Sequence, residues 1–153
     1  AELVDTLLPE EQGNEAVFEL LFAAMRLLDE GRDARLVTLI FEMGVLRLTG
    51  YRPELRQCIG CATEILPGEN GFSSEGGVLC PDCLRLRPDA VAMSVGALKL
   101  LRAIDRGDIE RLVGLRIPPS VWGDLSTVLP RYIARITGRE SAARRVIAEL
   151  QLQ

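Results

Sequence analysis

The sequence predicts an all-α helical bundle with an inserted four-cysteine β-hairpin. Apolar residues recur at helical spacing before and after one central segment. That segment, residues 57–89, contains all four cysteines of the chain, together with five glycines and three prolines, and it has no helical period. We therefore expect a helical hairpin over residues 1–56, a cysteine-bearing insert over 57–89, and a helical part over 90–153 that completes the same bundle within one domain.

Two helices are predicted ahead of the insert, after an irregular lead-in over residues 1–13. The first covers 15–30 and follows Asn14, whose side chain can cap it. Apolar residues surround most of its circumference, so we expect this helix to be buried on most sides. The second covers 34–49 and begins after Asp33. The short link between the two helices predicts an antiparallel pair.

Helical patterns return after the insert. A helix over 94–106 starts at a serine cap, and a short helix is expected over 108–114. A longer helix opens at 118–120 and ends at Gly138. Pro130 lies inside its pattern, so we expect a kink or a break there. A last helix is expected over 141–150.

The cysteines form two Cys-x2-Cys pairs that are separated by 18 residues; they are Cys58, Cys61, Cys80 and Cys83. This spacing is typical of structural zinc sites. Two residues between thiolates allow a tight turn to direct both sulfur atoms at one ion about 2.3 Å away. A hairpin with strands at 72–74 and 78–80 returns the chain and brings the two pairs together. The sequence therefore predicts a zinc-binding β-hairpin that holds one structural Zn2+.

Two other interpretations of the cysteines stay open. They could form redox-active or disulfide-bonded pairs, or they could hold iron in a rubredoxin-like electron carrier, which uses the same ligands. The paired spacing and the expected cytosolic location favour zinc over disulfides. A rubredoxin-like site is favoured by aromatic neighbours, and Phe72 alone lies close in the sequence.

Composition excludes several kinds of active site. The chain has no histidine, which excludes Ser–His–Asp and Cys–His catalysis and every His-ligated metal. Four thiolates would also close the coordination shell of a zinc ion, leaving no position for a substrate. We therefore do not expect an enzyme. No stretch approaches the roughly 20 apolar residues of a membrane helix, so we expect a cytoplasmic protein without a membrane partner.

Positive charge is concentrated near the end of the chain. Residues 1–50 carry a net charge of −6, whereas residues 131–145 carry +4. Arginines in this segment and beside the cysteine hairpin could contact DNA or an acidic peptide. Alternatively, they are solvated helix cations, or they balance the formal charge of −2 on a four-thiolate zinc site. These candidates are Arg131, Arg135, Arg139, Arg144, Arg145, Arg52, Arg56, Arg85 and Arg87.

Other candidates have a structural interpretation. Lys99, Arg102 and Arg106 share one face of the helix over 94–106, which we expect to be a solvated face. Trp122 and Tyr132 are expected in the core or in the wall of a groove, rather than as platforms for stacked bases.

Several short motifs are distributed along the chain. They are Leu7-Leu8-Pro9-Glu10-Glu11, Phe18-Glu19-Leu20-Leu21, Gly50-Tyr51-Arg52-Pro53-Glu54-Leu55, Phe72-Ser73, Gly76-Gly77-Val78-Leu79-Cys80, Ser94-Val95-Gly96-Ala97-Leu98, Tyr132 and Gly138-Arg139. With these motifs the whole chain resembles the RecO family, and the Gly-Tyr-x-Pro lead into the first cysteine pair is the most specific part. One departure is Ala62, which stands where many relatives have glycine.

The resemblance implies a recombination mediator for DNA repair. Such proteins bind single-stranded DNA, anneal complementary strands and, with RecR, load recombinase onto DNA that is coated with single-strand binding protein. The helical part of the family offers a groove for the acidic, aromatic-ended tail of that coating protein. The family normally begins with an OB-fold domain ahead of this region, so we expect weak DNA affinity without it. The implied location is cytoplasmic and nucleoid-associated.

A second hypothesis belongs to a different functional class. The chain could be a zinc-stabilised protein-interaction adaptor without a nucleic-acid role, and single-strand binding measurements separate the two. A third hypothesis, the rubredoxin-like electron carrier, requires iron.

Overall fold

The computed structural model describes residues 2–7 and 15–138, and helices make up most of this part. The strands lie in and just after the cysteine-bearing insert. In chain order the elements are α1 (Glu2–Leu7), α2 (Glu15–Asp29), α3 (Ala34–Leu48), β1 (Asn70–Ser73), β2 (Gly77–Leu79), α4 (Pro81–Arg85), β3 (Val91–Met93), α5 (Val95–Arg106), α6 (Ile109–Leu112) and α7 (Pro119–Thr137).

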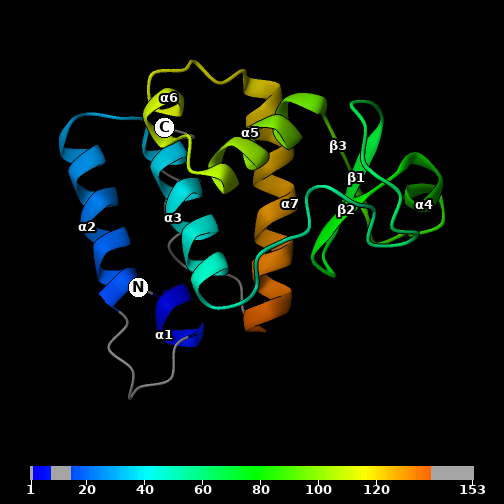
Figure 1. Ribbon diagram of the computed structural model, residues 1–153, viewed down its shortest axis with the longest axis horizontal. Coiled ribbons are helices and arrows are strands. Elements are labelled where there is room, and N and C mark those ends of the chain that lie inside the picture. The colour runs from blue at the N-terminus through cyan, green and yellow to red at the C-terminus, as the bar shows by residue number, and fades with distance from the viewer. Residues whose placement is uncertain (1, 8–14, 139–153) are drawn as a thin grey trace.

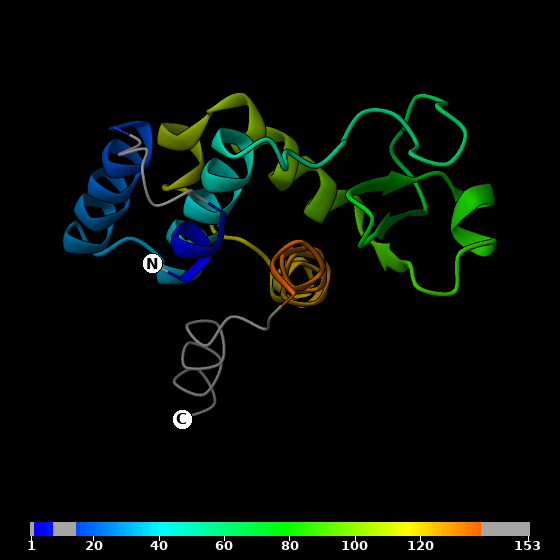
Figure 2. The ribbon, with the colours of Figure 1, turned by 90° about the horizontal axis from the view of Figure 1, so that it is seen from below.

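The helices form a body at one end of the molecule, and the small sheet with α4 forms the other end (Figure 1). Helices α2 and α3 are the predicted antiparallel pair, and α5 packs against both α3 and α7. Seen from below, α7 stands between the α2–α3 pair and the sheet (Figure 2). In that view, α5 and α6 lie on one side of the α2–α3 pair and α1 lies on the other. None of the described helices is both long and apolar enough to cross a membrane.

Local capping signals set the helix ends much as the sequence predicts. The Asp33 carboxylate accepts a hydrogen bond from the Arg35 N–H at 2.9 Å at the start of α3. The Ser94 hydroxyl accepts one from the Ala97 N–H at 3.2 Å at the start of α5. Gly107 ends α5 in the left-handed conformation, with φ of 84°, which glycine adopts without a steric penalty.

Three expectations about helices need correction. Residues 2–7 form α1 rather than an irregular lead-in, because Leu3 and Leu7 pack against the core. A short helix, α4, follows Cys80 inside the insert, where no helical period was visible; Pro81 at its first position favours helix initiation. Finally, of the kink or break expected at Pro130, the break does not occur, since α7 is one helix from Pro119 to Thr137. The helix continues through it because flanking residues on both sides, such as Leu129 and Ile133, are buried.

The expectation that α2 is buried on most sides is wrong. Only Val17 and Ala24 are buried in this helix. It packs against α3 along one narrow line, where Leu20 lies directly over Gly44; a β-carbon on Gly44 would come within 2.5 Å of Leu20. The apolar surface of α2 is wider than its contact with α3. Large apolar side chains of α2 are therefore left exposed.

The predicted hairpin is part of a three-stranded antiparallel sheet in the order β2-β1-β3. Phe72 pairs with Val78 of β2 on one side and with Val91 of β3 on the other. The two predicted strands start one or two residues earlier than expected. The third strand was not predicted, because three residues directly ahead of a helix cap carry too little pattern to identify a strand.

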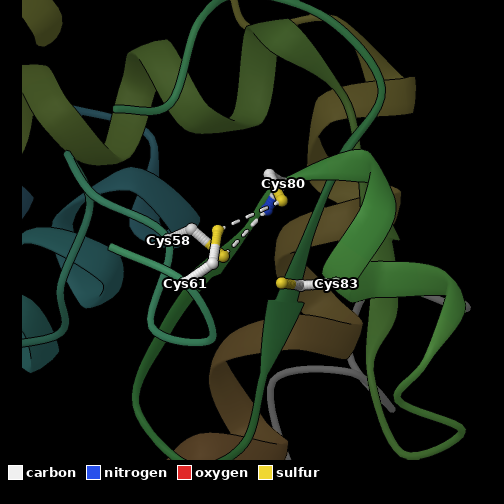
Figure 3. Close-up of side chains that lie close together, drawn as sticks. All are labelled: Cys58, Cys61, Cys80 and Cys83. Carbon is white, nitrogen blue, oxygen red and sulfur yellow. Dashed lines mark hydrogen bonds between the residues drawn. The ribbon is translucent and has the colours of Figure 1, made fainter. Parts of the chain in front are cut away.

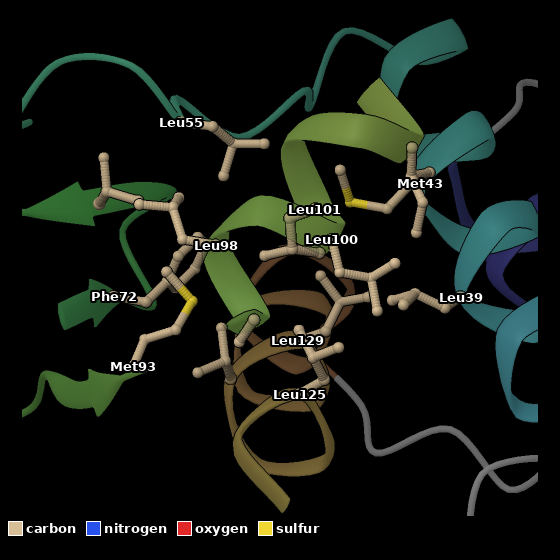
Figure 4. Close-up of a cluster of buried hydrophobic side chains, with 14 of the residues drawn as sticks. Leu39, Met43, Leu55, Phe72, Met93, Leu98, Leu100, Leu101, Leu125 and Leu129 are labelled. Carbon is tan, nitrogen blue, oxygen red and sulfur yellow. The ribbon is translucent and has the colours of Figure 1, made fainter. Parts of the chain in front are cut away.

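One hydrophobic core joins the sheet to the helices (Figure 4). Phe72 and Met93 point from the strands toward Leu98 of α5, and Leu129 of α7 belongs to the same cluster. The ring of Phe72 also meets that of Tyr132 edge to face, with 5.9 Å between the ring centroids. The insert therefore has no separate core of its own among the described residues.

Candidate metal centre

A short extended segment leads into the first cysteine pair and fixes its direction. The Glu54 N–H donates to the Gly76 carbonyl at 2.9 Å, and the Val78 N–H donates to the Glu54 carbonyl at 2.9 Å, which holds the segment against β2. The Glu54 carboxylate accepts the N–H groups of Arg56 and Gln57. These two hydrogen bonds lower the pKa of Glu54 and turn the chain toward Cys58.

The first cysteine pair lies in a tight turn over residues 58–63, here called the first knuckle, which is closed by backbone hydrogen bonds. The Cys58 N–H donates to the Thr63 carbonyl at 2.8 Å, and the Ala62 N–H donates to the Cys58 carbonyl at 2.8 Å. Ala62 completes the turn with φ of 62°, in the left-handed region that favours glycine. Gly60 is needed for a different reason, because a β-carbon there would lie 2.8 Å from the Cys83 sulfur.

The second knuckle is the start of α4. Cys80 precedes the first residue of the helix and Cys83 lies within its single turn. The Cys80 N–H donates to the Cys58 sulfur at 3.3 Å, so the backbone of the second knuckle already contacts a sulfur of the first. The β1–β2 hairpin connects the two knuckles and returns the chain, as the spacing predicts.

All four sulfur atoms converge from the two knuckles (Figure 3) and lie within 4.8 Å of one another. The Cys61 and Cys80 sulfurs are 3.8 Å apart. A tetrahedral ion with metal–sulfur bonds of about 2.3 Å requires sulfur–sulfur separations of roughly 3.8 Å. The cluster therefore fits a tetrahedral metal ion with four thiolate ligands.

The surroundings of the sulfurs shift the pKa values of Cys58 and Cys83 in opposite directions. Burial raises the pKa of Cys58, but N–H groups of Cys80, Gly60 and Cys61 outweigh it and lower the pKa to about 6. At Cys83, hydrogen bonding to the other sulfurs, Cys58 first, raises the pKa to about 12. Four crowded sulfurs cannot all be anionic without a cation between them, so a metal ion would displace protons on binding.

Polar contacts from α5 and α7 hold the chain before and after the first cysteine pair against the helices. The Arg102 guanidinium donates to the backbone carbonyls of Leu55 at 2.8 Å and Ile65 at 3.1 Å, on either side of the first knuckle. The Tyr132 hydroxyl donates to the Tyr51 carbonyl at 2.7 Å. Arg102 was expected on a solvated face. Its position four residues after the buried Leu98 is the signal that could have placed it next to the core.

The candidate arginines beside the insert are mostly engaged in ion pairs. Arg52 forms a two-pronged pair with Asp105 at 2.7 and 2.6 Å. Arg85 pairs with Asp82, and Arg87 pairs with Glu75 in the β1–β2 turn. Arg56 is exposed.

The candidate arginines of α7 reach the same turn. Arg135 lies 3.9 Å from Glu75, which therefore stands between Arg135 and Arg87. Arg131 is exposed one helical turn earlier. Arg139, Arg144 and Arg145 lie outside the described residues.

The remaining candidates have structural surroundings. Lys99 is exposed, and Arg106 pairs with Asp108. Trp122 is half-buried, with the Arg35 guanidinium 4.8 Å from the centre of its ring.

The chain is similar to one protein family and to several proteins that share one name. A family model described as "Recombination protein O C terminal" matches residues 1–145. The chain is 38% identical to the DNA repair protein RecO of Dehalococcoides mccartyi, over 88% of the chain and 53% of that protein. It is 36% identical to the protein of the same name from Roseiflexus sp., over 92% of the chain and 50% of that protein.

A third relative, the DNA repair protein RecO of Symbiobacterium thermophilum, is 34% identical over 98% of the chain and 61% of its own length. The chain thus spans between half and three-fifths of the length of these relatives. No solved structure matches the chain significantly.

Proposed function

The chain belongs to the RecO family, and from that premise we propose that it is the zinc-bearing C-terminal region of a recombination mediator. In this role it assists single-stranded DNA binding, strand annealing and recombinase loading in the cytoplasm, at the nucleoid, and it catalyses no bond cleavage. The observation that carries the proposal is the family match over residues 1–145 of 153.

The metal in the four-cysteine site is one structural Zn2+. The support is the sulfur separation of 3.8 Å and the two Cys-x2-Cys pairs. In this role the ion fixes the insert against α5 and α7, and each cysteine supplies one thiolate. Elemental analysis of the purified protein should give one zinc per chain and a colourless solution. One iron per chain with visible colour would instead support the electron carrier.

The DNA contact is assigned to an arginine surface made by Arg87, Arg131 and Arg135. These side chains come from α7 and from the segment after α4. Glu75 lies between Arg87 and Arg135, and Asp89 also acts on Arg87, so the surface has a small net positive charge. Arginines grouped in this way suit phosphates, because each can replace a counterion of the DNA backbone. The expected binding is weak and sensitive to salt.

Fluorescence anisotropy with a labelled single strand at low salt tests this assignment. Replacing Arg131 and Arg135 by glutamate should weaken binding by about ten-fold or more, and should reduce the salt dependence. Arg111→Glu is the matched control, because Arg111 is exposed on α6 at the other end of the molecule. Unchanged affinity and salt dependence in the double variant would remove these two arginines from the proposal.

The partners of this region are RecR and the acidic tail of single-strand binding protein, as the family resemblance implies. A cavity of about 80 Å³ between α2, α3, α5 and α6 is a candidate site for the tail. Apolar side chains such as Ile40 and Ile104 line it, and the exposed Arg47 could pair with a carboxylate. Arg47→Glu should abolish binding of an acidic, aromatic-ended peptide, measured by calorimetry, whereas Arg111→Glu should not.

The alternative function is an adaptor that binds proteins alone. The ion pairs of Arg52, Arg85 and Arg87 favour it, because each of these charges already has a partner within the chain. A chain that binds the acidic peptide, but binds no single strand even at low salt, would support the adaptor.

A further inference from the structure

The wall of the cavity between α2, α3, α5 and α6 contains two charged side chains of opposite sign. They are Arg47 of α3 and Asp105 of α5, and every other residue that lines the cavity is apolar or a glycine. Arg47 is exposed, and no ion pair among the described residues engages it. The Asp105 side chain is only 7% exposed. A carboxylate with so little water around it repels an anion, unless a cation lies beside it.

Arg52 compensates the charge of Asp105 from outside the cavity. Its guanidinium donates to both carboxylate oxygens, with Nε 2.7 Å from Oδ1 and Nη2 2.6 Å from Oδ2, but Arg52 does not line the cavity. The contact with Asp105 is the main reason that the pKa of Arg52 is raised, and Glu54 adds a smaller electrostatic effect. A forked pair of this kind is neutral overall. The positive charge of Arg47 is therefore the uncompensated charge of the cavity wall.

The backbone on both sides of Arg52 is held in place by other elements. The Tyr51 carbonyl accepts a hydrogen bond from the Tyr132 hydroxyl of α7 at 2.7 Å, and the Glu54 N–H donates to the Gly76 carbonyl at 2.9 Å. From this fixed segment the Arg52 side chain reaches a residue of α5 that is 53 positions away in the sequence. Fixed surroundings reduce the entropy that an ion pair costs, so this pair is a stable part of the fold.

We propose that Arg52 is a specificity-determining residue of the cavity. By neutralising Asp105, it allows Arg47 to select a ligand that carries a carboxylate over an uncharged ligand of the same shape. Arg47 contacts the ligand, whereas Arg52 acts through Asp105 and does not touch the ligand. The inference rests on the proposed tail site and names the chemical group that this site recognises. It also gives Arg52 a role within the chain, in place of a contact with DNA.

Peptide titrations of the full 153-residue chain, followed by NMR, test this role. One probe is the acetylated peptide Asp-Asp-Asp-Ala-Phe with a free C-terminal carboxylate, and the other is the uncharged Asn-Asn-Asn-Ala-Phe with a C-terminal amide. The unchanged chain should bind the acidic peptide more tightly by about ten-fold or more. Arg52→Gln should weaken binding of the acidic peptide by about ten-fold, the order expected for one unit charge in a partly enclosed site, and should leave binding of the uncharged peptide unchanged.

Variants of the partner separate this electrostatic role from a merely structural one. Adding Asp105→Asn to Arg52→Gln should restore the preference for the acidic peptide, because the wall beside Arg47 is then neutral again. Arg52→Lys should keep most of the preference, since it retains the charge although it loses the fork. Asp105→Asn alone leaves no buried charge without a partner, and it should bind the acidic peptide a few-fold more tightly than the unchanged chain. Weaker binding by Asp105→Asn, or no restoration in the double variant, would contradict the proposal.

A matched control is available at the other end of α3. Arg35 also makes a forked pair, with Asp33 at 3.2 and 2.8 Å, but neither residue lines the cavity. Arg35→Gln should therefore leave the affinity for both peptides unchanged. If Arg52→Gln keeps the full preference for the acidic peptide, the role of Arg52 is wrong and the tail site stands. If the unchanged chain binds neither peptide, or binds both equally, the tail site and the role of Arg52 are both wrong.

Discussion

Ala62 holds the first knuckle in a conformation that disfavours side chains. Its φ of 62° lies in the left-handed region, which costs an alanine about 1–2 kcal/mol and glycine almost nothing. The turn tolerates this strain because the Cys58 and Ala62 backbone groups are fixed by hydrogen bonds at 2.8 Å. The strain also gives a physical reason for the glycine that the family resemblance leads one to expect at this position.

Ala62→Gly should therefore stabilise the metal-loaded protein, by about 0.5–1 kcal/mol after the greater freedom of glycine in the unfolded chain is subtracted. Urea unfolding measures this. Ala92→Gly is the control: Ala92 is exposed in an extended strand, so the same change there should destabilise by about 0.5–1 kcal/mol. A loss of stability at both positions would show that the knuckle is not strained.

The four sulfurs predict how metal affinity depends on pH. The pKa of Cys83 is raised to about 12, so its proton must leave whenever a metal binds near neutral pH. The pKa of Cys58 is lowered to about 6, so this thiol adds a further competing proton only below that pH. Affinity should therefore fall as pH falls, and fall more steeply below about pH 6. Competition with a chromophoric chelator measures it, and a pH-independent affinity would contradict the expectation.

At the scale of elements, α5 holds the insert through Arg102. This side chain donates to two carbonyls on either side of the first knuckle, so it bridges two turns of the insert and a helix. Arg102→Met should destabilise the protein by about 1–2 kcal/mol, since both hydrogen bonds involve a charged donor on a half-buried side chain. It should also speed metal release to a chelator.

Two variants define the role of Arg102 further. Arg102→Lys should recover part of the loss, because one ammonium cannot match the forked guanidinium. Arg106→Met, which removes an exposed ion pair of the same helix, should cost less than about 1 kcal/mol. Equal effects of Arg102→Met and Arg106→Met would mean that the carbonyl contacts contribute nothing.

At the scale of the whole molecule, the insert and the helices share a core. Phe72, Met93 and Leu79 of the strands belong to the same buried cluster as Leu101 and Leu129 of the helices. We therefore propose that the chain folds as one unit, although its helical body and its sheet lie at opposite ends (Figure 1). The metal would then stabilise the helices as well as the insert that holds it.

Metal removal tests this coupling. Chelation should lower the midpoint of thermal unfolding for the far-UV helix signal, because binding free energy at a structural site is also folding free energy. The metal-loaded protein should unfold in a single transition. If the helix signal is unchanged while the insert alone loses order, the insert is a separate unit. Arg111→Glu, at an exposed position of α6, should leave the unfolding midpoints of the metal-loaded and the metal-free protein unchanged.

Several features were predictable because the physics that sets them is local. The caps at Asp33 and Ser94 act within three residues of themselves, and apolar spacing repeats within a few turns. The cysteine pairs were likewise identifiable, since two intervening residues suffice to aim two sulfurs at one point. The RecO resemblance, which the comparisons confirm, rests on the same contiguous motifs.

Other features were decided only by tertiary structure. Sequence periodicity shows that α2 has a wide apolar surface, but whether that surface is buried depends on what lies beside it, and α3 covers only part. Arg102 looks like a solvated cation until the insert brings two carbonyls to it. Glu75 joins arginines 12 and 60 positions away in the chain only because the β1–β2 turn meets α7. Caps and spacings are fixed between neighbours along the chain, whereas burial and ion pairing are fixed between neighbours in space.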